Sequence, residues 1–140
     1  MAFTGNFSCN TLRSGLANGS INLTTDTFYL ALYTNAATLD ETTTAYTTTG
    51  EATGGNYTAG GQVVTATVSS EATSSGSVVY VSFSSPSWTG QITARGALIY
   101  KAGGNGAVCV LDFGNDKTSA NTFTVTMPAN TSTSALIRLV

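Results

Sequence analysis

A chain of 140 residues suits one domain, because a single hydrophobic core can serve that length. Its formal net charge is −2, only 9% of its residues are charged and it contains no histidine, so uncharged polar side chains must form most of the surface. This composition excludes Ser-His-Asp triads, Cys-His pairs and imidazole metal ligands, and its few scattered basic residues leave no footprint for nucleic acid.

The first ten residues, "MAFTGNFSCN", lack the basic and apolar regions of a signal peptide. No apolar run reaches membrane-spanning length, so we expect no membrane partner and synthesis in a cytoplasm. We expect residues 1–10 to form an N-terminal arm on a single domain of residues 1–140. Cys9 and Cys109 are too few and too far apart along the chain for a disulfide framework or zinc site, which predicts reduced, packed cysteines.

"NTLRSGLANG" (residues 10–19) places two leucines four residues apart and ends in Asn-Gly, which predicts a short helix. "TFYLALYT" (residues 27–34) is a nearly continuous run of apolar and aromatic residues and predicts a central strand. Residues 34–54 show no periodicity, much threonine and little to bury. They are predicted to form a long variable surface loop.

From residue 62 the hydrophobic period is mostly two, which is typical of strands. The predicted strands are "QVVTATVSS" (62–70), "VVYVSFSS" (78–85), "QITARGALIY" (91–100), "AVCVLDF" (107–113), "TFTVTM" (122–127) and "ALIRLV" (135–140). The segments between them, "SPSWTG", "KAGGNG", "GNDKTSAN" and "PANTST", are turn-like. We therefore predict an all-β fold, an antiparallel β-sandwich or jelly-roll-like domain with one short N-terminal helix.

The acidic residues do not form a pattern that predicts catalysis. Paired carboxylates need two acids on converging elements, and only Asp112 lies inside a predicted strand. Within one residue of register it faces Arg95 across the hairpin around "KAGGNG", so a structural ion pair is expected. "DFGND" (residues 112–116) lacks both the context of a kinase and the ligand spacing of a calcium loop. We predict no enzymatic activity, no cofactor and no metal.

Three aromatic residues in predicted loops allow two interpretations. Trp88, Tyr46 and Tyr57 could form a carbohydrate platform, since rings in loops often serve recognition. Trp88 could instead plug one end of the sandwich, which we favour because tryptophan is usually highly buried. Tyr57 is similarly expected to pack as a lid over that end.

"GGNYTAGGQVV" (residues 54–64) resembles a phosphate-binding loop only in its glycines. It has no lysine, and β-branched residues follow it in place of a helix. We predict that it leads into a strand, with Gly60 and Gly61 permitting a tight turn or bulge.

Several segments in this order resemble small virion proteins of tailed bacteriophages: "NTLRSGLANGSINLTTDTFYLALYT", "NYTAGGQVV", "SWTGQITARGALIY", "VCVLDFG" and "TFTVTM". Among these proteins, size and β content look most like capsid decoration (cement) proteins. The resemblance implies a structural protein on the capsid surface of a virion, with the major capsid protein as partner and a homo-dimer or homo-trimer as assembly. The alternative is a tail, neck or baseplate component, which includes the case of a receptor- or glycan-binding module. The residues expected to contact a partner are Phe3, Phe7, Tyr46 and Trp88.

Overall fold

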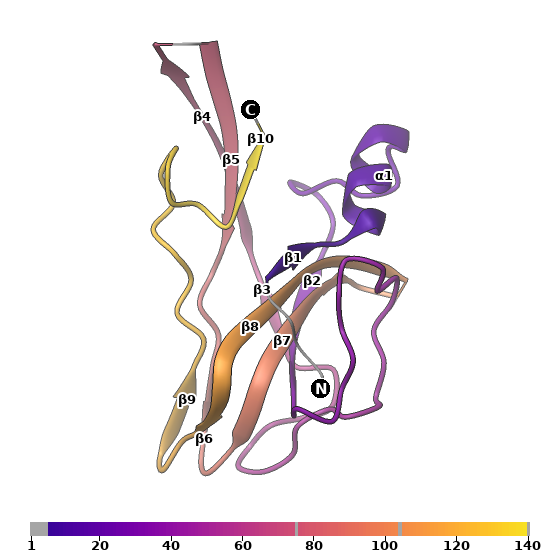
Figure 1. The fold of residues 1–140 in the computed structure, drawn as a ribbon, viewed down its shortest axis with the longest axis vertical. Coiled ribbons are helices and arrows are strands. Elements are labelled where there is room, and N and C mark those ends of the chain that lie inside the picture. Colours follow the sequence, from indigo (N-terminus) through magenta and orange to yellow (C-terminus); the bar gives the residue numbers. More distant parts are fainter. Residues whose placement is uncertain (1–5, 75, 104, 140) are drawn as a thin grey trace.

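The computed structural model describes residues 6–74, 76–103 and 105–139 (Figure 1). Its elements are β1 (Phe7–Ser8), α1 (Asn10–Asn18), β2 (Phe28–Tyr33), β3 (Gln62–Val64), β4 (Ala66–Thr73), β5 (Gly76–Phe83), β6 (Ser87–Thr89), β7 (Thr93–Lys101), β8 (Gly106–Thr118), β9 (Thr122–Thr124) and β10 (Ile137–Leu139). The fold is an all-β, antiparallel, sandwich-like structure with one short helix near the N-terminus among these residues, which confirms the predicted fold class.

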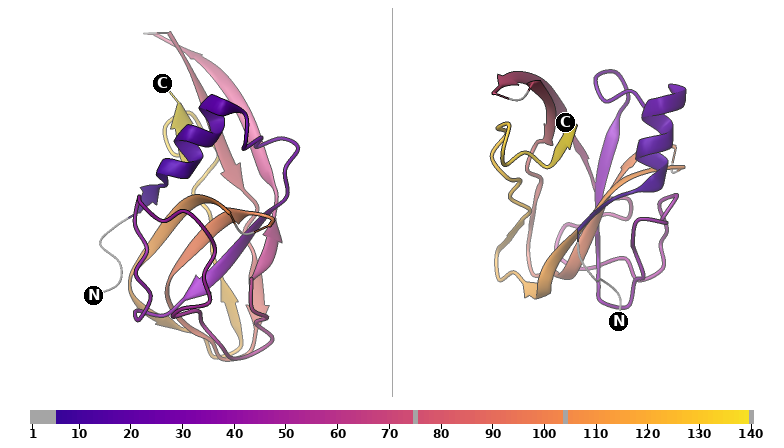
Figure 2. Two further views of the ribbon diagram at one scale, coloured as in Figure 1. Left: turned by 90° about the vertical axis from the view of Figure 1, so that its right-hand side faces the viewer. Right: turned by 45° about the horizontal axis from the view of Figure 1, so that its top comes forward.

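The strands form three antiparallel sheets. A five-stranded sheet has the order β1-β8-β7-β2-β3, a three-stranded sheet has the order β10-β5-β4, and β6 pairs with β9. The chain passes from the first sheet to the second between β3 and β4, at Thr65. As a result, the β4–β5 hairpin projects beyond the other strands at one end of the molecule (Figures 1 and 2).

Two cores lie on opposite faces of the β8-β7-β2 sheet. On one face, Leu30, Leu32 and Ile99 pack in the main core with side chains from the other sheets, among them Phe83 and Trp88. The other face has a smaller core formed by Ala31, Tyr33, Leu98, Tyr100, Val110 and other buried side chains. Because β2 is covered on both faces, it reads as a continuous apolar run in place of an alternating one.

The long segment between β2 and β3 is the cover of that second face, which corrects the prediction of a loop with little to bury. Ala37 is 0% exposed and Leu39 is 1% exposed, and both pack in the smaller core. Figures 1 and 2 show this segment running alongside the sheet, away from the projecting hairpin. The sequence did not indicate this burial, because the few apolar residues of the segment follow neither a helical nor a strand period.

Three predicted boundaries are wrong. Residues 6–10 of the expected arm join the fold, because Phe7 pairs with Val110 and the helix begins at Asn10; residues 1–5 lie outside the described part. Residues 114–118 of the predicted turn 114–121 belong to β8, which pairs with β7 as far as Thr118 through two register irregularities. Residues 87–89, expected in a turn, form β6 because β9 supplies its partner. Pairing partners distant in sequence decide all three cases.

Both cysteines are free and buried, as predicted. Cys9 packs in the smaller core and Cys109 in the main core. Burial raises the pKa of Cys9 to about 11 and raises the pKa of Cys109 as well. The thiolate, which is the reactive form, is therefore scarce at neutral pH.

Neither thiol is expected to react with a disulfide reagent such as dithionitrobenzoate while the protein is folded, and both should react in denaturant. Timed absorbance readings at pH 8 check this result. Rapid reaction of one thiol per chain under native conditions would contradict the burial of both cysteine side chains.

Candidate functional site

The most concentrated group of titratable and aromatic side chains lies around Glu51. Its Oε1 accepts a hydrogen bond from the Tyr46 hydroxyl at 2.6 Å, and its Oε2 accepts one from the Tyr57 hydroxyl at 2.5 Å and one from the Gly60 N–H at 2.7 Å. The Tyr100 hydroxyl donates to the Gly60 carbonyl at 2.6 Å. We refer to these five residues as the Glu51 cluster.

The Glu51 cluster connects the long β2–β3 segment to the sheet. The Tyr46 ring stacks on the Tyr100 ring of β7, with 4.9 Å between the ring centroids. The Tyr57 hydroxyl, besides donating to Glu51, accepts the Leu32 N–H of β2 at 3.0 Å. One carboxylate thereby joins residues 46, 57 and 60 to each other, and their partners on β2 and β7 anchor the group.

Desolvation raises the pKa of the tyrosines in this cluster. It raises the pKa of Tyr100 to about 12, and for Tyr46 and Tyr57 the hydrogen bond to the Glu51 carboxylate raises the pKa further, because it stabilises the neutral phenol. The hydroxyls therefore remain protonated donors at neutral pH. A tyrosine acting as a nucleophile or general base would need the opposite shift of its pKa.

Gly61 allows the chain to approach β2 closely. Gly60 and Gly61 both have left-handed backbone conformations, with φ of 95° and 82°. A Cβ atom on Gly61 would overlap the Leu30 carbonyl oxygen, whereas one on Gly60 would meet the Tyr100 hydroxyl at 3.3 Å. The segment "GGNYTAGGQVV" thus forms a tight entry into β3, and Tyr57 packs against Trp88 with 5.5 Å between the ring centroids.

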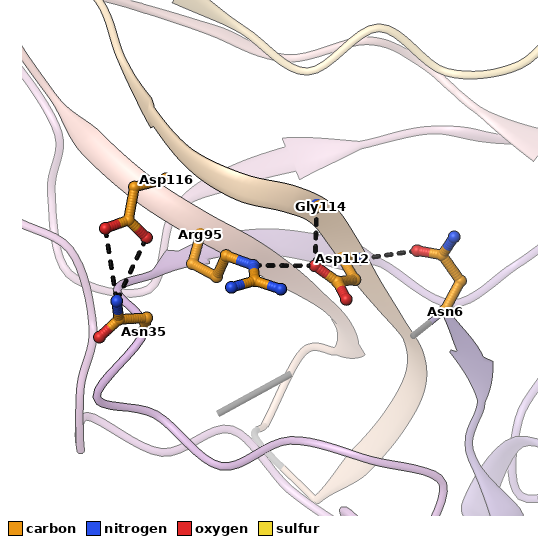
Figure 3. Close-up of polar contacts among 6 residues, drawn as sticks. All are labelled: Asn6, Asn35, Arg95, Asp112, Gly114 and Asp116. Carbon is orange, nitrogen blue, oxygen red and sulfur yellow. Dashed lines mark hydrogen bonds and ion pairs between the residues drawn. The ribbon is translucent and has the colours of Figure 1, made fainter. Parts of the chain in front are cut away.

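Arg95 and Asp112 form an ion pair across β7 and β8, with Arg95 Nε 3.0 Å from Asp112 Oδ1 (Figure 3). The same oxygen accepts the Gly114 N–H at 2.9 Å, and Asn6 Oδ1 accepts the Asp112 N–H at 2.6 Å. Burial alone would raise the pKa of Asp112, but the hydrogen bond from Gly114 and the Arg95 guanidinium together hold it below its ordinary value. This arrangement fixes the course of β8 after its last residue paired with β1.

Asp112→Asn is expected to lower the free energy of unfolding by about 1–2 kcal/mol at pH 7, because a charged acceptor is replaced by a neutral one. Since the folded-state pKa is lowered, this contribution is complete above the ordinary aspartate value of about 3.9 and is lost as the pH falls through the lower folded-state value. Urea unfolding of both proteins between pH 7 and pH 2.5 should therefore show a difference that shrinks below pH 4. A difference that is constant over this range would contradict the ion pair.

The residues predicted to contact a partner are not brought together. Trp88 is 2% exposed in the main core, so it is not displayed and the packing interpretation of Trp88 holds. Tyr46 is half-buried and donates to Glu51, and its contact with a partner stays a prediction. Tight packing from β9 and from Tyr57 encloses the indole. Phe7 is half-buried beside the smaller core, and Phe3 lies outside the described residues.

Two open grooves lie away from the Glu51 cluster. One, of about 420 Å³, lies beside β8 and β9 and is lined by Phe113, Lys117, Phe123, Val125 and neighbouring hydroxyl residues. The other, of about 320 Å³, lies between α1 and β10. Neither has an acid among its lining residues, so neither pairs an acid with a nucleophile.

Sequence reasoning missed Glu51 as an organising residue. The signal was an acid near the end of a threonine-rich segment, with Tyr46 and Tyr57 on either side and a glycine pair after it. Nothing in these spacings indicates that the three side chains converge, because the segment has no regular period.

Across residues 6–74, 76–103 and 105–139, no group of three Asp, Glu, Cys or His side chains could hold a metal ion. No helix in this part of the chain is long and apolar enough to cross a membrane. No family model, curated protein or solved structure matches the chain.

Proposed function

We propose that this chain is a structural protein of a tailed-bacteriophage virion, acting as a decoration protein that binds the outside of the mature head and clamps neighbouring capsomers. The observation that carries the proposal is the Glu51 cluster. Its polar and aromatic side chains form hydrogen bonds that hold a long loop against a β-sheet. The chain thereby presents a preorganised body with no open reactive group at this site, and we expect no enzymatic activity.

The surface chemistry supports this proposal. With 9% charged residues and a net charge of −2, the chain can bury surface against a shell at a small cost in charge desolvation. Modest contacts of each copy would be multiplied by avidity on a symmetric lattice. The resemblance of the segments around "NYTAGGQVV" and "TARGALIY" to virion proteins points to the same class, with the major capsid protein as the partner.

Counting copies tests the proposed location. Quantitative mass spectrometry of purified virions of the phage that encodes this chain, scaled to the major capsid protein, should give hundreds of copies per particle. A dozen or fewer would overturn decoration in favour of the tail, neck or baseplate.

Binding tests the proposed mechanism. Purified protein should bind mature heads prepared without it and should raise their resistance to heat, because a ligand of the mature state stabilises that state. Unexpanded procapsids are the matched control and should bind far less. Binding of the isolated protein to host cells or glycans, with no binding to heads, would support the receptor-binding alternative instead.

A further inference from the structure

β4 presents an open edge of eight residues. It is the last strand in the order β10-β5-β4, and β5 is its only strand partner in the described part of the chain. Just before β4, the Ser84 N–H donates to the Thr65 carbonyl at 2.9 Å. Because antiparallel pairs alternate, the odd-numbered residues of β4 bond to β5, and the N–H and C=O groups of Ala66, Val68, Ser70 and Ala72 point outward.

The edge of β8, in contrast, is protected against the addition of a strand. Beyond Val110, β8 has no described strand on its β1 side. There the Asp112 N–H donates to Asn6 Oδ1, and the Gly114 N–H donates to the Asp112 carboxylate (Figure 3). Gly114 also bends the backbone with φ of 88°. Side-chain caps, charges and irregular backbone are the usual means of preventing strand addition.

β4 has little of this protection. Its sequence, "ATVSSEAT", has one charged residue, Glu71, and no proline, and its pairing with β5 has no register irregularity. One face of its sheet also leaves apolar side chains in water: Val68 is 40% exposed, Val79 is 37% exposed and Leu139 is 47% exposed. Their registers place the three on the same face as buried Val81. An added strand would pack beside Val68 on this face as well as pair with the edge.

We propose that β4 pairs antiparallel with β4 of a second copy about a two-fold axis at Ser69, joining two three-stranded sheets into one sheet of six strands. In this register Ala66 faces Ala72 of the second copy and Val68 faces its Ser70, so every outward-pointing N–H and C=O group of β4 has a partner. Glu71 faces Thr67, and the two Glu71 residues lie four positions apart, about 13 Å along the strand. This separation exceeds the Debye length of about 8 Å at physiological salt.

The occupant is a second copy because the edge is complementary to itself. Its four outward-facing residues are spaced symmetrically about Ser69, and the side chains that meet are small, with Ser69 itself at the axis. β4 of a second copy fits this edge without a shift of register and without placing like charges opposite each other. The inference uses only the strand pairing and does not depend on the proposed function.

A proline substitution tests the edge. Ser70→Pro removes an outward N–H and leaves the bonds between β4 and β5 intact, since the Ser70 N–H does not face β5. Sedimentation equilibrium of the full chain should show a reversible monomer–dimer equilibrium, and Ser70→Pro should raise the dissociation constant at least about tenfold, because two symmetric hydrogen bonds are lost. Circular dichroism melting under dilute conditions checks that the variant folds.

A charge swap tests the register and the identity of the partner. Ser69→Lys and Ser69→Glu each place like charges opposite one another at the axis, so each should weaken its own dimer, whereas their equimolar mixture should regain it. A wild-type chain that stays monomeric at hundreds of micromolar would overturn the proposal. So would a dimer that Ser70→Pro leaves unchanged, or a mixture of the two Ser69 variants that regains nothing. Pairing of β4 with a strand of a capsid protein, by a chain that never dimerises, would also overturn the proposal.

Discussion

Glu51→Ala is expected to lower the free energy of unfolding by roughly 3–5 kcal/mol, because three donors lose a charged acceptor in a partly buried setting. The donors are the Tyr46 and Tyr57 hydroxyls and the Gly60 N–H. Without the carboxylate, the segment between β2 and β3 loses the group that joins residues 46, 57 and 60. Urea unfolding followed by tyrosine and tryptophan fluorescence measures the change.

Glu41→Ala is the matched control for Glu51→Ala. Glu41 is an exposed acid in the same segment, and only its backbone carbonyl bonds to another residue of the described chain, Asn10. Its loss should change the free energy of unfolding by no more than about 0.5 kcal/mol. Equal effects of the two substitutions would show that the Glu51 cluster does not hold the segment. Glu51→Gln should lie between them, since it retains one acceptor oxygen.

Gly61→Ala is expected to destabilise the protein by at least about 3 kcal/mol, through backbone strain together with a steric overlap. Its φ of 82° disfavours a side chain, and the added Cβ would overlap the Leu30 carbonyl oxygen. Either β3 would move away from β2 or the entry into β3 would change conformation. Valine at the same position should prevent folding at 37 °C.

Gly19→Ala separates strain from overlap, because Gly19 ends α1 with φ of 83° and its Cβ would meet no atom within 4 Å. Strain alone should cost about 1–2 kcal/mol there. Thermal and urea unfolding of both variants gives the difference between their losses in free energy of unfolding. This difference measures the steric overlap of residue 61 with β2. Equal costs at the two positions would refute that approach.

The elements with strong local signals were predictable. The leucine spacing and Asn-Gly ending of residues 10–19 correspond to α1 and its left-handed Gly19. Alternation in "TFTVTM" places Phe123 and Val125 in the main core, although only residues 122–124 are in β9. The Arg95–Asp112 pair also followed from the hairpin, to within one residue of register: Asp112 faces Gly96, and Arg95 lies beside it at a register irregularity.

The elements defined by distant partners were not predictable. β6 has only three residues and exists because β9 returns beside it. The last five residues of β8 carry two charges and a glycine, which locally indicate a turn. Trp88 shows the same limit in part: its burial was the favoured interpretation, but its place in a strand paired with Phe123 was not predicted.

By itself, the sequence determined the class of fold, the short helix and the absence of histidine chemistry, because period, composition and turn residues are local properties. Tertiary structure alone decided that the threonine-rich segment covers a second face of the sheet, that Glu51 gathers its donors, and that β8 is capped while β4 is open. These features depend on contacts between residues far apart in the chain. Their spacing along the sequence carries no period from which the contacts could be read.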